Sequence, residues 1–217
     1  MSGLDAGRVR ANAERVRAEI DAAARRAGRD PAAVELLVAV KYVAVEDLGA
    51  LLEAGLTLFG ENRAQELQEK AAAWPGAGIR WHFIGQLQSR KVKQILPLVE
   101  LIHSVASESA LAQLERHGTP DTRVLVEVDI AGEEGKAGIA PHELGDFVAR
   151  CPVPVSGLMT MPPFTENPED SRAYFARLAE LAAEHGLERL SMGTTQDYEV
   201  AVAEGATIVR LGSVLYD

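Results

Sequence analysis

The chain has 217 residues and a net charge of −10, which argues against a general nucleic-acid binder, since such proteins need a basic footprint. Hydrophobic residues make up 47% of it, enough for a sizeable core and too many for global disorder. Its one cysteine, Cys151, excludes an internal disulfide, and no apolar run approaches the roughly 20 residues that span a bilayer. We therefore expect a cytoplasmic protein without membrane or nucleic-acid partners, with a monomer as the default state.

The first expected element is a polar amphipathic helix, over about residues 4–27. From residue 34 onward, short apolar runs alternate with stretches rich in Ala, Leu and Glu, a pattern typical of strands followed by helices. The expected strands are 34–40, 57–60, 80–85, 101–104, 123–130, 155–159, 189–192 and 207–211. The expected helices between them are 46–54, 62–73, 88–96, 107–117, 141–150, 168–185 and 195–204.

Eight strands that alternate with helices predict an α/β fold with a parallel sheet, and the count of eight favours a closed (β/α)₈ barrel of the TIM type. An open doubly wound sheet is the alternative, although it usually has fewer strands. No linker interrupts the alternation. We expect a single domain over 1–217, with 1–30 forming an extra N-terminal helix packed on the barrel and nothing following the last strand.

Lys41 ends the first expected strand. A buried lysine costs free energy unless it is paired or neutral, so strands seldom finish on one without a reason. At the carboxyl end of a barrel strand, where such folds place their chemistry, a lysine suits imine formation with a carbonyl ligand. A solvated strand end is the alternative interpretation.

The turns after the last two strands form a second pattern. Gly193, Thr194 and Thr195 follow one strand, and Gly212 and Ser213 follow the other; in these barrels this pair of loops is the usual phosphate site. The alternative is simple capping, in which Thr194 pairs with Asp197.

Three further polar residues on or after the expected strands, Asn62, His82 and His103, can each be explained without a ligand. Asn62 with Gln65 also fits a helix cap. His82 and His103 lie inside apolar strands and are expected to be core residues. No histidine–carboxylate cluster has metal spacing, so no metal site is expected.

Taken together, several segments resemble the pyridoxal-phosphate homeostasis protein family, whose fold is the alanine racemase N-terminal barrel. The resemblance covers about residues 8–217. The segments that carry it are 39–41, 59–66, 81–88, 102–105, 138–141, 157–163, 190–193 and 204–212.

The resemblance implies that Lys41 holds pyridoxal 5′-phosphate (PLP) as an internal aldimine. It also implies a role for each remaining site residue: Thr194, Thr195, Gly212 and Ser213 would take the phosphate, Arg210 would approach the pyridine nitrogen, and Asn62 would lie beside the ring. The chain departs from the family at Thr194 and Thr195, where Met-Ser is usual.

The expected function is to hold PLP for intracellular homeostasis, by buffering it or delivering it to apo PLP-dependent enzymes, without robust catalysis. An arginine beside the pyridine nitrogen leaves that nitrogen unprotonated and the cofactor a weak electron sink. A racemase also needs a second acid–base group, which its relatives take from a further domain that we do not expect here. The alternatives are a small PLP-dependent amino-acid racemase and, less favoured, a Schiff-base aldolase acting on a sugar phosphate.

Overall fold

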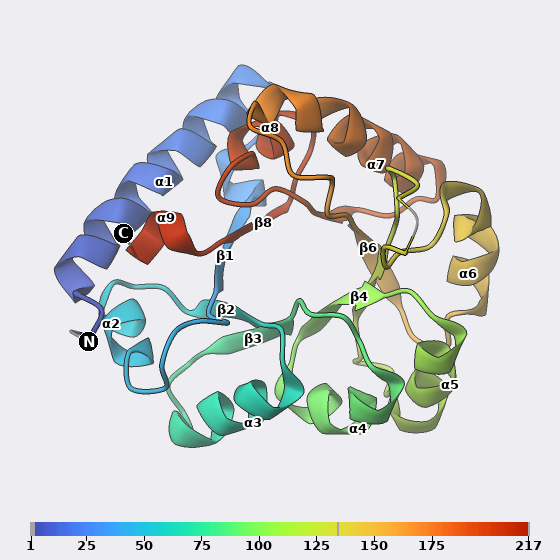
Figure 1. Cartoon of the computed structure of the whole chain (residues 1–217), viewed down its shortest axis with the longest axis horizontal. Coiled ribbons are helices and arrows are strands. Elements are labelled where there is room, and N and C mark those ends of the chain that lie inside the picture. The colour runs from blue at the N-terminus through green and yellow to red at the C-terminus, as the bar shows by residue number, and fades with distance from the viewer. Residues whose placement is uncertain (1–2, 134, 217) are drawn as a thin grey trace.

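Eight parallel strands close into a barrel in the computed structural model, which describes residues 3–133 and 135–216. Each strand pairs with the next along the chain, and β8 pairs back with β1. Figure 1 shows the ring of helices outside the strands. The strands are β1 (Glu35–Ala39), β2 (Leu58–Glu61), β3 (Arg80–Phe83), β4 (Leu101–Val105), β5 (Val124–Glu127), β6 (Val155–Met159), β7 (Arg189–Ser191) and β8 (Ile208–Leu211). The predicted (β/α)₈ barrel is confirmed.

One helix precedes β1, one follows β8, and the others lie between the strands, where helices were expected, with their ends shifted by a few residues. They are α1 (Ala6–Arg26), α2 (Leu48–Glu53), α3 (Ala64–Ala73), α4 (Val92–Ile95), α5 (Glu108–His117), α6 (Leu144–Arg150), α7 (Arg172–Glu184), α8 (Tyr198–Ala203) and α9 (Ser213–Tyr216). The expected helix 88–96 is divided into the 3₁₀ turn Ser89–Lys91, α4 and the 3₁₀ turn Leu96–Leu98, where Pro97 cannot donate to a helical ladder. α9 was not expected, because four residues are too few for a periodic pattern.

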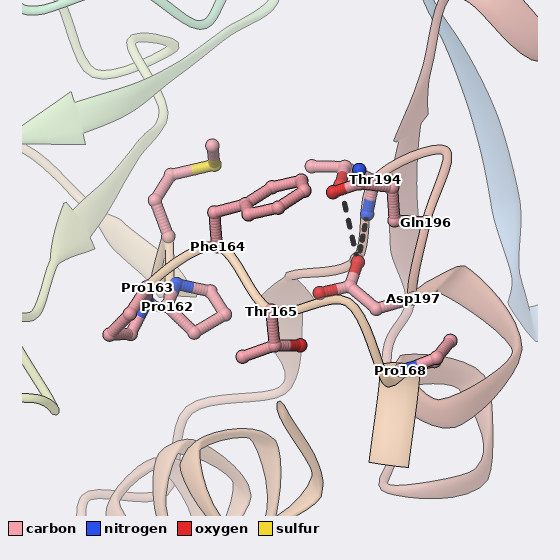
Figure 2. Close-up of a pocket in the computed structure, with 10 residues that line it drawn as sticks. Pro162, Pro163, Phe164, Thr165, Pro168, Thr194, Gln196 and Asp197 are labelled. Carbon is pink, nitrogen blue, oxygen red and sulfur yellow. Dashed lines mark hydrogen bonds between the residues drawn. The ribbon is translucent and has the colours of Figure 1, made fainter. Parts of the chain in front are cut away.

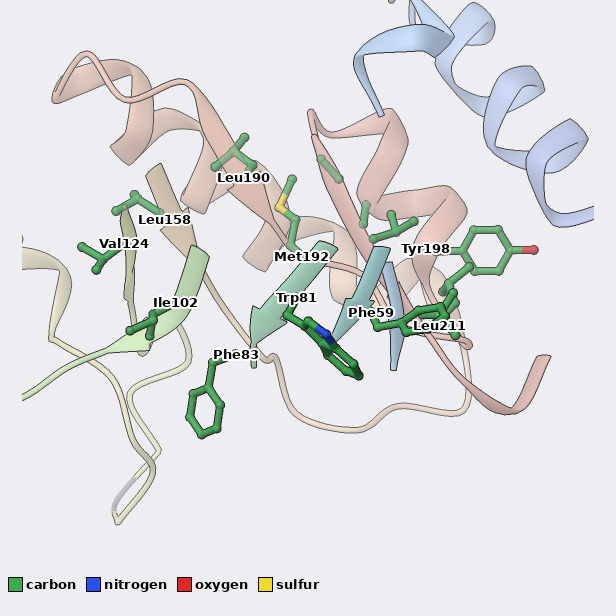
Figure 3. Packing of buried hydrophobic residues seen from close by; sticks show 14 of the residues in the cluster. Phe59, Trp81, Phe83, Ile102, Val124, Leu158, Leu190, Met192, Tyr198 and Leu211 are labelled. Atoms are coloured by element: carbon green, nitrogen blue, oxygen red, sulfur yellow. The ribbon is translucent and has the colours of Figure 1, made fainter. Parts of the chain in front are cut away.

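Two apolar layers hold the barrel together. Outward-facing strand residues, among them Phe59, Trp81 and Leu158 in Figure 3, form one cluster with the buried faces of the helices. The rings of Phe59 and Trp81 meet edge to face, with centroids 5.6 Å apart. A separate inner cluster fills the barrel with one residue from each of six strands: Leu37, Leu58, Leu101, Leu125, Met159 and Ile208.

Helix α1 covers the last part of the chain (Figure 1). The Asp5 side chain accepts a hydrogen bond from the Arg8 backbone and caps its first turn. Its buried stripe includes Val9, Val16 and Ile20, at the spacing of one helical face. Because α1 packs on α8 and α9, it supports the loops that follow β7 and β8. No described helix is both long and apolar enough to cross a membrane.

Candidate functional site at the carboxyl ends of the strands

A cavity of about 530 Å³ opens at the carboxyl ends of β1, β2, β7 and β8. All the residues that we expected to form a site line it: Lys41, Asn62, Thr194, Thr195, Arg210, Gly212 and Ser213. Tyr42, Ile84, Met161 and Tyr216 are among the other lining residues. Residues separated by up to 177 positions in the chain, from Ala39 to Tyr216, thus share one wall, because parallel strands end at the same face of the barrel.

Lys41 is exposed and stands in the turn after β1, not at the end of a buried strand as we expected. β1 ends at Ala39, and buried Val40 continues the ladder through its N–H to the Gly60 carbonyl, 3.0 Å away. The chain then turns, since the Val43 N–H reaches back to the Val40 carbonyl. The Lys41 Nζ lies 5.0 Å from the centroid of the Tyr42 ring.

Asn62 does not cap a helix. α3 begins at Ala64, and the N–H groups of Asn62 and Arg63 are instead accepted by Glu61 Oε1, at 2.7 and 3.3 Å. The Asn62 Oδ1 is buried and has no hydrogen-bond partner among the described residues. Because a buried polar atom without a partner costs free energy, this oxygen fits an acceptor that awaits a ligand.

The loops after β7 and β8 meet at the cavity. The Asp197 Oδ1 accepts from both the backbone N–H and the hydroxyl of Thr194, at 2.7 and 3.2 Å, so the predicted pairing of Thr194 with Asp197 is present. It closes a turn before α8, which begins at Tyr198. The Thr195 hydroxyl lies 3.5 Å from the Gly212 N–H and joins the two loops.

Arg210 is buried, and four acceptors hold its guanidinium. Its Nη1 donates to the Ser191 carbonyl and hydroxyl, and its Nη2 donates to the Thr160 carbonyl and the Met161 sulfur. These bonds use the terminal nitrogens, so within the described chain the Nε–H is the donor left for a ligand. Burial lowers the pKa of Arg210 to about 10, which still leaves it cationic at neutral pH.

Two buried histidines extend the hydrogen bonds of Arg210 into the barrel, by way of the Ser191 hydroxyl. The His103 Nδ1 lies 2.8 Å from the Ser191 hydroxyl, and its Nε2 lies 3.0 Å from the His82 Nδ1. Burial, followed by the charge of Arg189, lowers the pKa of His82 to about 3, and burial likewise holds the pKa of His103 well below its usual value. Both are core residues, as expected.

A second, smaller pocket of about 110 Å³ adjoins the cavity (Figure 2). The two share Met161, Thr194 and Gln196, and Pro162, Pro163 and Phe164 line the far side of the smaller pocket. No cluster of His, Cys, Asp and Glu suited to a metal ion occurs within residues 3–133 and 135–216.

Comparison with known proteins agrees with this geometry. The family model of the alanine racemase N-terminal domain matches residues 5–217. A pyridoxal phosphate homeostasis protein from Aquifex aeolicus is 42% identical over 215 residues, covering 93% of this chain and 94% of that protein. The chain belongs to the pyridoxal phosphate homeostasis protein family.

Solved structures of similar chains have the same barrel. The crystal structure of an unknown protein from Bifidobacterium adolescentis superimposes with a TM-score of 0.86 at 32% identity, over 97% of this chain and 95% of that one. PipY of Synechococcus elongatus, solved with PLP bound, gives a TM-score of 0.75 at 30% identity, over 92% of this chain and all of that one. The resemblance to this family that the sequence motifs predicted is confirmed.

Sequence reasoning missed three side chains that hold the site. Lys70 and Tyr216 donate to the Val40 and Ala39 carbonyls, at 2.7 and 2.9 Å, and Glu61 binds the backbone at Asn62. A signal for Lys70 was present, because it lies three residues after Leu67 on the buried face of α3. Tyr216 lies in the unexpected α9 and had no such signal.

Proposed function

We propose that this chain binds PLP covalently on Lys41 and acts in intracellular PLP homeostasis, as a holder of the cofactor. The observation that carries the proposal is the convergence of Lys41, Arg210 and the hydroxyl-bearing loops 194–195 and 212–213 on one cavity of about 530 Å³. The names of the relatives and the PLP in PipY support it.

The residues present fit such a ligand at three points. The Asn62 Oδ1 is a buried acceptor that lacks a partner among described residues, and the Arg210 Nε–H is a donor left over after the terminal nitrogens are bound. The hydroxyls of Thr195 and Ser213 stand at the loops where barrels of this type bind phosphate. The Arg210 donor, the Asn62 acceptor and the Lys41 amine thus lie on or after three different strands around one cavity.

PLP supplies an aldehyde, which condenses reversibly with a lysine amine and releases water. Lys41 would provide that amine, and it is exposed at the cavity. Thr195, Gly212 and Ser213 are proposed to bind the phosphate. Thr194, which the sequence also predicted as a phosphate ligand, lines the cavity, but its N–H and hydroxyl both donate to Asp197. Arg210 would present its cation to the ring nitrogen and, since it stays protonated at neutral pH, would not supply that nitrogen with a proton.

The cavity favours a holder over an enzyme. Apart from Lys41, its described titratable lining residues are Tyr42, Arg210 and Tyr216. Burial, followed by the charge of Glu61, raises the pKa of Tyr216, and its hydroxyl is bound to the Ala39 carbonyl. Tyr42 is 86% exposed and lies beside Lys41 itself. None of these is suited to exchange a proton on the side opposite the lysine.

The test is borohydride reduction of the protein with PLP, followed by peptide mass mapping. We expect the reduced adduct on the peptide that contains Lys41, and we expect Lys41→Ala to lose both the adduct and the visible absorbance of bound PLP. Lys93→Ala, which removes another exposed lysine, is the control and should retain both. A wild-type protein that stays colourless with excess PLP would refute the proposal.

A racemase remains the second candidate, because the matching family model is named for the domain of such an enzyme. Loss of α-deuterium from an L-amino acid, at a rate that depends on Lys41, would support it. We expect no such loss with the PLP-loaded protein. A lysine adduct with the mass of a sugar phosphate would instead indicate the aldolase.

A further inference from the structure

A buried ion pair lies directly behind the cavity. Lys70 of α3 and Glu61 of β2 are 3% and 0% exposed, and their side chains meet at 2.6 Å. Among the residues that the structure describes, Lys70 is the one buried lysine. Replacing such a pair by packed apolar residues is often neutral for stability, so its position needs an explanation beyond stability.

The partners of this pair are the backbone groups next to two ligand-facing residues. The Lys70 Nζ donates to the Val40 carbonyl at 2.7 Å, one residue before Lys41. The other oxygen of Glu61 accepts the Asn62 N–H at 2.7 Å. One continuous set of charge-assisted bonds therefore runs from the turn of Lys41 to the turn of Asn62.

The strand register explains why one pair can reach both turns. Ala39 on β1 lies opposite Gly60 on β2, so Lys41 and Asn62 leave neighbouring strands two residues later. The ladder stops at the Val40 N–H, and beyond it the backbone needs other partners. Lys70 and the Val43 N–H bind the Val40 carbonyl, and Glu61 binds the Asn62 N–H.

We infer that Lys70 and Glu61 are positioning residues that fix the position of the Lys41 turn relative to the Asn62 turn. This inference rests on the proposed function. Through this link the amine is presented to a ligand whose ring is already in place. The pair makes no contact with the ligand. Its effect is on the covalent step, since reactions between held groups are sensitive to displacements of about 1 Å.

The test compares PLP with pyridoxine 5′-phosphate, which has the same ring and phosphate but no aldehyde to condense with Lys41. For Lys70→Met we expect the Kd of PLP to rise about tenfold or more, and that of pyridoxine 5′-phosphate to rise about threefold at most. The ratio of the two Kd values isolates the covalent step. A general loosening of the fold would weaken both ligands equally.

Lys70→Met leaves Glu61 buried without its cation and could prevent folding. The second variant is therefore the double change Glu61→Gln with Lys70→Met, which keeps an amide oxygen for the Asn62 N–H and buries no charge. It should show the same change in ratio, because it also removes the bond from Lys70 to the Val40 carbonyl.

Arg29→Met is the matched control. Arg29 also ties a cation to backbone carbonyls, those of Val202 and Ala206, but before β8, at the opposite end of the barrel. We expect it to lower the melting temperature without changing the ratio. An unchanged ratio in both pair variants would overturn the inference while leaving the proposed function intact. Absence of covalent PLP in the wild type would overturn the proposed function itself.

Discussion

At the scale of the residue, Gly85 shows how closely the loop after β3 packs against the Asn62 turn. It follows β3, and a Cβ placed there would lie 2.1 Å from the Asn62 carbonyl oxygen. Real Cβ atoms do not approach a backbone oxygen so closely, so only glycine lets the two loops touch. The contact keeps the Asn62 turn, whose Oδ1 awaits a partner, against the wall of the cavity.

We therefore expect Gly85→Ala to displace Asn62 and to destabilise the fold by about 1–3 kcal/mol, the usual cost of overpacking. Its Kd for pyridoxine 5′-phosphate should also rise, since that ligand binds the ring subsite without the lysine. Gly7→Ala in α1 is the control, because the added Cβ lies at an exposed helical position and meets an exposed side-chain oxygen, Asp5 Oδ1 at 3.3 Å, and no backbone atom. Urea unfolding and ligand titration measure both effects. Wild-type values for Gly85→Ala would show that the loops have room to separate.

At the scale of the element, α1 acts as a brace for the carboxyl-terminal part of the site. Its Asn12 side chain donates to the Leu215 carbonyl of α9 at 3.3 Å, and its Glu19 accepts the Tyr198 hydroxyl of α8. α9 in turn begins at Ser213 and carries Tyr216, both of which line the cavity. A helix that precedes the barrel thus supports residues at the far end of the chain.

Val16→Asp tests this brace, because Val16 is fully buried in α1. An unpaired carboxylate there should destabilise the protein by about 3 kcal/mol or more. Ala18→Asp makes the same charge at an exposed position of the same helix and should change stability by less than about 0.5 kcal/mol. Urea unfolding of the two variants checks the difference. Equal losses would mean that α1 contributes through its charge and not through its packing.

At the scale of the whole molecule, the barrel interior is divided into an apolar and a polar part. The inner leucine-rich cluster fills one part, and His82, His103, Ser191 and Arg210 occupy another. The histidines are neutral when folded, because burial and the nearby arginines disfavour a second proton. Arg210 is therefore the group in this hydrogen-bonded series that carries a charge.

This arrangement predicts a loss of stability in mild acid. Below about pH 6.5 the unfolded state protonates each histidine, whereas folded His82 stays neutral down to about pH 3. The unfolded state then binds more protons, so stability falls as the pH falls through this window. Between pH 7 and pH 5 the loss should be about 2 kcal/mol for each buried histidine.

Urea unfolding at the two pH values measures this loss in the wild type. His82→Gln should reduce it, whereas His142→Gln, which removes an exposed histidine, should not. Nuclear magnetic resonance gives an independent check. An imidazole of His82 that titrates near pH 6.5 in the folded protein would contradict the prediction.

The sequence by itself determined the order of the elements, favoured a closed barrel over an open sheet, and indicated the family. These follow from local information: apolar runs, helical periodicity, and motifs such as those at 59–66 and 81–88. It also identified Lys41, Asn62 and Thr194 as site candidates, because they follow strands whose carboxyl ends must meet, and the family resemblance added Arg210. Their roles toward PLP stay predictions.

Only the tertiary structure decided which lysine is buried. Lys41, expected at a buried strand end, is exposed, and Lys70 is the lysine enclosed with Glu61. The hydrogen bonds from Tyr216 to Ala39 and from Arg210 to Thr160 join positions far apart in the chain. The physical reason is that burial and pairing depend on what the closed barrel brings together, whereas periodicity reports only on neighbours along one helix or strand.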